Sequence, residues 1–198
     1  MNITAQLVNE LRQRTSIGMM DCKKALTEAE GDIEKAIKIL RKKGLARAKD
    51  KMSRDASDGV IGSYIHMNSR LGVLVEVNSE SDFVARNEEF QELVKNIAMH
   101  IAAANPQYIS QADIPEKVLE EEKDIIRDQL KDSNKPPEII EKIVAGKLGK
   151  FYSEVCLLNQ PFIKEDKTTI EQLVATHIAK FGENIQVKRF ARFALGES

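Results

Sequence analysis

The amino-acid sequence predicts an α+β fold, in which a small antiparallel sheet is covered by helices on one face. Two patterns support this class. Apolar residues recur at helical spacing along most of the chain, whereas two stretches, near residues 60–78 and 185–195, alternate with a period of two. With 198 residues, 42% of them hydrophobic and 31% charged, the chain has the composition of a soluble globular protein.

The first 45 residues predict a domain made of a compact three-helix bundle, with helices expected over residues 4–15, 21–30 and 32–43. A turn is expected at Ser16–Gly18. Asp21 and Asp32 are expected to cap the second and third helices, and Gly31 and Gly44 to end them. Because a bundle of this size buries little surface, we interpret it as a binding module.

Residues 46–58 are charged and mostly basic, which predicts a helical linker, and residues 59–198 predict one α+β core domain. The core opens with a β-hairpin of residues 60–67 and 71–78, in which alternate valines occupy one face. A long amphipathic helix over residues 90–102 is then expected to pack across this hairpin.

A helical hairpin is expected around residues 115–160, with a turn from Ser133 to Pro137 and an interruption at Pro161. Thr168 and Glu171 have the spacing of a capping box for one more helix, which Gly182 would end. A third strand over residues 185–195 completes the sheet. The other face of that sheet needs a cover, which a second subunit would supply.

The composition excludes several classes of protein. A formal charge of −1 provides no global field for nucleic acid or an anionic membrane. Cys22 and Cys156, the only cysteines, are far apart, which suits two buried thiols in a reducing compartment rather than a disulfide framework. The chain enters an amphipathic pattern directly after Met1, without a signal peptide or membrane segment, so a cytoplasmic location is expected.

The sequence contains no phosphate-binding loop, dinucleotide fingerprint, zinc motif or serine nucleophile turn, so no catalytic residue, cofactor or metal is expected. We interpret His66, His100 and His177 as structural histidines, because each has apolar neighbours. One alternative is a nucleic-acid-binding module on the last strand, where basic and aromatic residues interleave: Lys188, Arg189, Phe190, Arg192 and Phe193.

Phe83 stands in a polar segment directly after a strand, and such an aromatic either folds back as a lid on the core or stays exposed as an anchor for a partner. Patterning alone favours the lid. Met19 and Met20 present the same choice, because adjacent residues at a helix start cannot both point into a three-helix core.

Two long segments resemble the signatures of the elongation factor Ts family: Leu11–Leu26 (LRQRTSIGMMDCKKAL) and Ser81–Asn87 (SDFVARN). Shorter matches at Gly31–Ile37 and Gln160–Phe162 extend the resemblance over nearly the whole chain. The family often has Gly where this chain has Ser16, and usually Thr where it has Ser81, whose hydroxyl is expected to retain the capping role.

The resemblance implies a nucleotide exchange factor rather than an enzyme, with elongation factor Tu as its partner in the GDP-bound and nucleotide-free states. It implies that the bundle is a ubiquitin-associated-like domain that docks on the nucleotide-binding domain of elongation factor Tu. It also implies that the core delivers an aromatic wedge behind the nucleotide site, which disturbs Mg²⁺ and phosphate binding there. The implied contact residues are Ser81, Asp82, Phe83, Val84, Met19, Met20, Arg12 and Lys23.

The short chain resembles family members with an abbreviated core, and this favours a homodimer through the core sheet. No direct binding to nucleic acid or membrane is implied. Two other functions stay open: the nucleic-acid-binding module on the last strand, and a ubiquitin-associated-type adaptor that acts through residues 1–45 alone.

Overall fold

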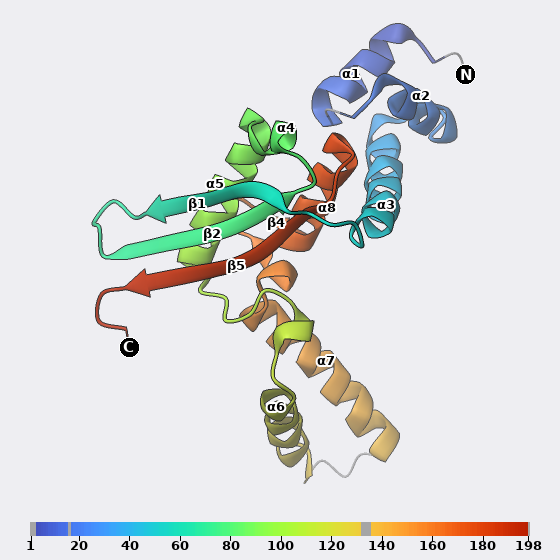
Figure 1. The fold of residues 1–198 in the computed structure, drawn as a ribbon. Coiled ribbons are helices and arrows are strands. Elements are labelled where there is room, and N and C mark those ends of the chain that lie inside the picture. The colour runs from blue at the N-terminus through green and yellow to red at the C-terminus, as the bar shows by residue number, and fades with distance from the viewer. Residues whose placement is uncertain (1–2, 16, 132–135, 198) are drawn as a thin grey trace. The chain divides into compact units, whose positions relative to one another are not determined.

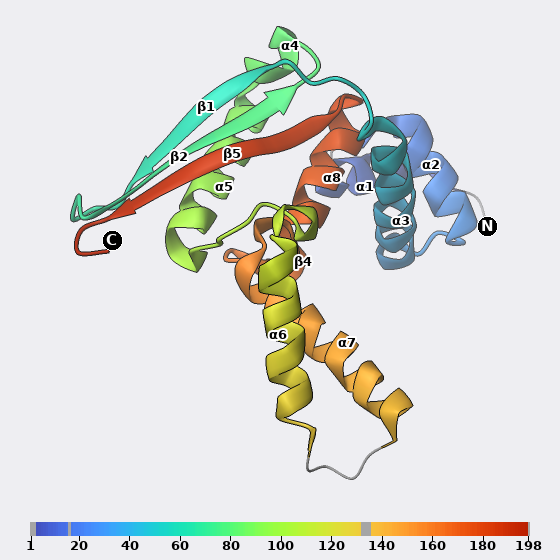
Figure 2. The same cartoon turned by 60° about the horizontal axis from the view of Figure 1, so that its bottom comes forward.

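The computed structural model describes residues 3–15, 17–131 and 136–197, and it confirms the α+β class (Figure 1). The main sheet has the strand order β1-β2-β5, and its neighbouring strands run antiparallel (Figures 1 and 2). Its strands are β1 (Asp58–Ile65), β2 (Leu71–Ser79) and β5 (Ile185–Ala194). Between β2 and β5 the chain forms α4 (Asp82–Ala85), α5 (Glu88–Ala104), α6 (Glu116–Asp128), α7 (Pro137–Val155) and α8 (Ile170–Phe181).

The chain divides into two compact units. The first contains Met1–Gly62, Glu76–Val94 and Gln172–Lys188, and the second contains Ser63–Val75, Lys95–Glu171 and Arg189–Ser198. The three strands of the sheet and α5 contribute residues to both units. The division into domains of residues 1–45, 46–58 and 59–198 stays a prediction.

The first three helices, α1 (Ala5–Thr15), α2 (Met19–Glu28) and α3 (Ile33–Lys51), pack around a shared apolar core in the first unit. The side chain of Thr4 accepts a hydrogen bond from the Leu7 amide, and Asp32 accepts one from the Lys35 amide at 2.9 Å. The fully or largely buried residues of this core are Val8, Leu11, Cys22, Ala25, Leu26, Ala29, Ala36 and Leu40.

Two predicted helix boundaries in this region are wrong. Asp21 is not a cap: α2 begins at Met19 with Gly18 as its N-cap, and the Asp21 amide already donates to the Gly18 carbonyl. Gly44 does not end α3, which continues to Lys51. A Cβ atom at Gly44 would lie only 3.2 Å from that of Ala179 in α8. The glycine thus permits close helix packing. Ser16 lies outside the described residues.

The hairpin of β1 and β2 closes with a hydrogen bond from the His66 amide to the Leu71 carbonyl. Val73, Val75 and Val77 of β2 are buried, as their alternation predicts. At the start of β1, Gly59 has a φ of +137°, and a Cβ atom there would lie 2.3 Å from the Val77 carbonyl oxygen. Only glycine fits this close approach of the two strands.

The second unit contains the predicted helical hairpin of α6 and α7 (Figure 2). Ile126 of α6 packs with Val144 and Leu148 of α7 in a small buried cluster. Helix α7 ends at Val155, before the predicted end of the hairpin near residue 160, and the short 3-10 helix η3 (Leu157–Asn159) follows. Residues 133–135 of the predicted turn lie outside the described part of the chain.

The predicted capping role of Thr168 is also wrong. Thr168 lies in a short strand, β4 (Glu165–Thr169), that pairs antiparallel with β3 (Pro161–Phe162), and α8 begins only at Ile170. The sequence pattern missed both strands because they are too short to show an alternation. Gly182 does end α8, with a φ of +76° and its amide bonded to the Ile178 carbonyl.

His100 of α5 is fully buried in the second unit. Its Nδ1 accepts the Ile163 amide at 3.4 Å, so Nε2 carries the proton and donates to Oε1 of Gln160 at 3.0 Å. Gln160 in turn donates to the Glu154 carbonyl at 2.8 Å. Burial lowers the pKa of His100, because a charged imidazole would lose its solvation.

Burial likewise lowers the pKa of His177 in α8, and the two shifts predict that the free energy of unfolding falls below about pH 6.5. A histidine whose folded pKa lies below its ordinary value is protonated first in the unfolded chain. Its stabilisation is therefore complete above that value and is lost as the pH falls. Urea denaturation between about pH 7.5 and 5.5 measures the trend. The double variant His100→Gln/His177→Gln should show a flatter dependence, and an unchanged slope would contradict this assignment.

Candidate partner-binding site

The short helix α4 presents Phe83 to solvent. The ring is 84% exposed, while the next two residues, Val84 and Ala85, are buried in the first unit. The lid interpretation of Phe83 is therefore wrong, because one turn of helix points the ring away from the core while its neighbours fill the core. An exposed aromatic on a buried base has the form of an anchor for a partner's pocket.

Local hydrogen bonds define the turn that carries Phe83. The Ala85 and Arg86 amides donate to the Ser81 and Asp82 carbonyls at 3.3 and 3.0 Å. The Asp82 carboxylate pairs with the Arg86 guanidinium at 2.9 Å, one helical turn later. The predicted capping by the Ser81 hydroxyl is wrong, because this side chain makes no cap hydrogen bond and is turned to another partner.

That partner is Glu183, about 100 residues later in the chain. Its Oε2 accepts the Ser81 amide at 3.0 Å, and its Oε1 accepts the Ser81 hydroxyl at 2.7 Å. The neighbouring residue Glu80 makes the reciprocal contact: its Oε1 accepts a hydrogen bond from the backbone amide of Asn184 at 2.6 Å. Each of the two loops, 80–81 and 182–184, thus binds a backbone amide of the other through a carboxylate. We call these four hydrogen-bonding residues, Glu80, Ser81, Glu183 and Asn184, the carboxylate network.

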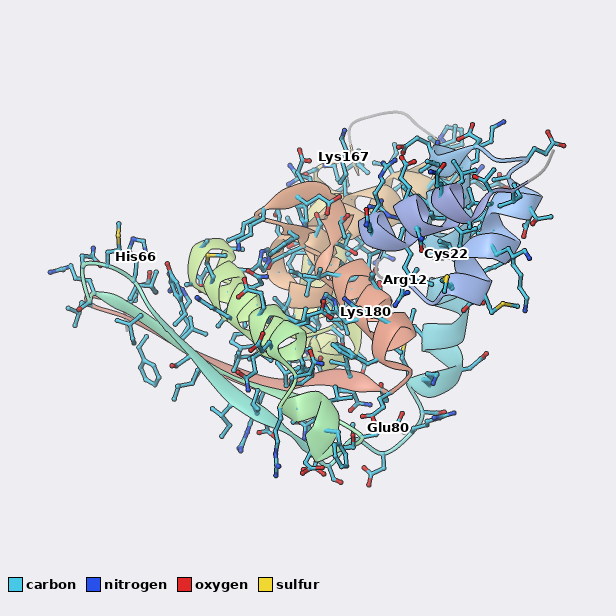
Figure 3. All side chains as sticks on the ribbon, turned by 90° about the horizontal axis from the view of Figure 1, so that it is seen from above. Arg12, Cys22, His66, Glu80, Lys167 and Lys180 are labelled. Carbon is cyan, nitrogen blue, oxygen red and sulfur yellow. The ribbon has the colours of Figure 1, made fainter. Side chains whose placement is uncertain are left out.

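The carboxylate network also contacts the end of α3. Asn184 is fully buried, and its side-chain NH₂ group donates to the Met52 and Arg54 carbonyls at 3.3 and 2.7 Å. Arg54 pairs with Glu80 at 3.5 Å, and the Lys51 ammonium donates to the Gly182 carbonyl. Three segments far apart in the sequence, 51–54, 80–81 and 182–184, therefore meet next to the turn that carries Phe83. Figure 3 labels Glu80 in this region.

Helix α2 exposes a second group of predicted contact residues. Met19 and Met20, in its first turn, are 52% and 67% exposed, so neither fills the bundle core. Lys23, one turn later, is exposed as well. Adjacent flexible thioethers in solvent are typical of surfaces that adapt to a partner.

Arg12, on α1, is exposed and lines a polar hollow of about 450 Å³. Across this hollow lie Glu89 and Lys180, which form an ion pair at 2.5 Å. Figure 3 labels Arg12, Lys180 and the buried Cys22, whose thiol donates to the Ile17 carbonyl inside the bundle.

The predicted contact residues thus form two groups within the first unit: Ser81 to Val84 on one turn, and Met19, Met20, Lys23 and Arg12 on the bundle. Among the described residues, no hydrogen bond or ion pair joins the two groups. Sequence reasoning missed Glu80 and Glu183, because nothing in the residue pattern links two acidic residues in loops so distant in the chain.

The interleaved basic and aromatic residues of β5 do not share one surface. Strand alternation places Lys188, Phe190 and Arg192 on one face and Arg189 and Phe193 on the other. Arg192 is occupied, since it donates to the Ala102 carbonyl and pairs with Glu197 at 2.5 Å. Within the ranges that the structure describes, no cluster of three or more metal-ligating side chains occurs, and no helix is long and apolar enough to cross a membrane.

Comparison with known proteins gives a consistent result along the whole chain. A family model described as "Elongation factor TS" matches residues 2–197. The elongation factor Ts of Thermodesulfovibrio yellowstonii is 60% identical over 198 residues, which cover 100% of this chain and 98% of that protein. Proteins of the same name from Thermosipho melanesiensis and Koribacter versatilis are 56% and 59% identical, over 98% and 100% of this chain and 100% and 90% of their own lengths.

The contrast between Phe83 and Val84 makes a prediction for stability. Phe83→Ala should change the free energy of unfolding by less than about 0.5 kcal/mol, because the ring contacts mainly water. Val84→Ala should lower it by about 1–3 kcal/mol, because a buried side chain is lost. Urea denaturation followed by circular dichroism measures both. A loss of about 3–5 kcal/mol for Phe83→Ala, as expected for a core phenylalanine, would restore the lid interpretation.

Proposed function

Because the chain belongs to the elongation factor Ts family of translation factors, we propose that it is a guanine-nucleotide exchange factor for elongation factor Tu. It binds the GDP form of this GTPase in the cytoplasm, promotes release of GDP and Mg²⁺, and holds the nucleotide-free state until GTP binds. The observation that carries the proposal is the exposed Phe83 ring on a buried, hydrogen-bonded base.

The energetics of this function follow from linkage. A factor that binds the nucleotide-free GTPase more tightly than the GDP form must weaken GDP binding by the same factor. Burial of one aromatic anchor in a partner pocket supplies about 2–4 kcal/mol, which corresponds to about 30- to 1,000-fold in an equilibrium constant. Such an effect needs no acid, base or nucleophile in this chain.

The two groups of exposed residues have different roles in this proposal. Asp82 and Phe83, supported by Ser81 and Val84, act on the elements behind the nucleotide site of the partner. Met19, Met20, Arg12 and Lys23 dock the bundle on its nucleotide-binding domain. The exposure of both methionines supports the docking role, because apolar thioethers gain free energy when a partner removes them from water.

Stopped-flow release of a fluorescent GDP analogue from elongation factor Tu tests the proposal. The wild-type chain should accelerate release, and Phe83→Ala should lose about 30-fold or more of the maximal acceleration, because the anchor is removed without loss of fold. Met67→Ala is the control: it removes an exposed apolar side chain from the loop between β1 and β2, and it should retain the wild-type maximal rate.

The outcomes separate the possible functions. Absence of acceleration by the wild-type chain overturns the exchange proposal. Equal acceleration by Phe83→Ala places the exchange activity elsewhere on the surface. Salt-dependent binding to RNA in a gel-shift assay would instead favour the nucleic-acid-binding function. Full binding of elongation factor Tu by the bundle residues alone would favour an adaptor.

We further propose that the free protein is a homodimer through the open face of the sheet. In the second unit this face carries exposed apolar side chains, which contribute to the lining of a groove of about 780 Å³. Three of them, Ile65, Leu74 and Phe193, are exposed on the three strands of the sheet, and Leu195 is exposed directly after β5. An uncovered apolar sheet face of this kind is unusual for a monomer, and a second copy would cover it with the same surface.

Sedimentation equilibrium at micromolar concentration tests the dimer. The wild-type chain should sediment as a dimer, and Phe193→Glu should shift it to a monomer, because a buried unpaired carboxylate opposes association. Met67→Glu serves as the control, since Met67 is exposed in the hairpin loop and does not line the groove. A monomeric wild-type protein contradicts the dimer and leaves the exchange function untouched.

A further inference from the structure

Phe83 is an anchor only if its backbone holds the ring in one direction before a partner arrives. A mobile aromatic would lose conformational freedom on binding, and this cost would be subtracted from the affinity. The residues beneath the ring therefore matter as much as the ring itself. In the first unit, the residue that determines the entry of the chain into α4 is Ser81.

Every polar group of Ser81 has a partner. Its carbonyl accepts the buried Ser79 hydroxyl at 2.9 Å and the Ala85 amide at 3.3 Å. Its amide and its hydroxyl both donate to one carboxylate, that of Glu183. Hydrogen bonds to a charged acceptor are stronger than neutral ones, and two of them to a single residue restrict rotation as well as position.

Glu183 is itself fixed. It lies between Gly182, whose carbonyl accepts the Lys51 ammonium, and Asn184, which is fully buried and bonded to the Glu80 carboxylate and to the carbonyls of residues 52 and 54. The loop that carries Glu183 is therefore held at both sides, so its carboxylate can act as a fixed support for Ser81.

We infer that Glu183 is a positioning residue for nucleotide exchange: its carboxylate holds Ser81 and thereby pre-organises the Phe83 ring for the partner. This inference rests on the proposed exchange function. Glu183 acts through Ser81 rather than through contact with the nucleotide, so its loss should matter only while the ring is present.

Two measurements test the assignment. In amide hydrogen exchange followed by NMR, Glu183→Ala should accelerate exchange of the Ser81 amide by about tenfold or more, because its charged acceptor is lost. In stopped-flow GDP release, the same variant should reduce the maximal acceleration by about tenfold, which corresponds to about 1.4 kcal/mol. Glu183→Gln should restore most of both, since an amide oxygen still accepts the Ser81 amide and its NH₂ group can donate to the hydroxyl oxygen.

A double-mutant cycle separates positioning from general damage. In the Phe83→Ala background, Glu183→Ala should change the release rate by less than about twofold, because the ring it positions is absent. Glu171→Ala is the charge-matched control at an exposed site in the first turn of α8, and it should match the wild type in both measurements.

Each outcome bears on a different claim. A wild-type rate for Glu183→Ala, or an effect of equal size with and without Phe83, overturns the positioning role while the exchange function stands. An unchanged Ser81 amide also overturns it. If the wild-type chain fails to accelerate GDP release, the proposed function fails, and the role of Glu183 in exchange fails with it. In that case the amide-exchange result still reports whether Glu183 holds Ser81.

Discussion

Two carboxylates, those of Glu80 and Glu183, hold together the part of the molecule that presents Phe83. Each accepts a backbone amide from the opposite loop, so the end of β2 and the start of β5 are joined. Arg54 and Asn184 extend the same network to the end of α3. Backbone amides in loops lack the regular partners of a strand or helix, and acidic side chains supply them here.

Much of the fold was predictable because its elements carry strong periodic patterns. The apolar stripe of α5 predicts a helix, and the alternating valines of β2 predict a strand. In both elements the residues that the pattern predicts to face inward are buried. The failures share a different cause. Gly44, Asp21 and Thr168 are residue types that usually mark boundaries. Gly44 instead packs against α8, Thr168 lies in the paired strand β4, and Asp21 lies inside a helix that begins at Met19. Local propensity is a weak guide when a neighbouring element fills the space.

The candidate site was predictable only in part, for a related reason. Resemblance to the family pointed to Phe83 and to the paired methionines, and their exposure is compatible with contact roles. Patterning alone favoured burial of Phe83, because a sequence does not show which side of a single helical turn faces the core. The support from Glu183 had no signal at all, since hydrogen bonds between loops about 100 residues apart leave no periodicity.

Helix α3 runs without interruption from Ile33 to Lys51, through a glycine that packs against α8. The bundle core and the network beneath Phe83 are therefore connected by a rigid rod within one compact unit rather than by a tether. In a helix, each inserted residue advances the axis by about 1.5 Å and rotates everything beyond it by about 100°. A flexible loop tolerates a change of length, whereas this rod does not. The number of residues in α3 between the bundle core and Lys51 is thus a fixed dimension of the protein, as much as any side chain that touches a partner.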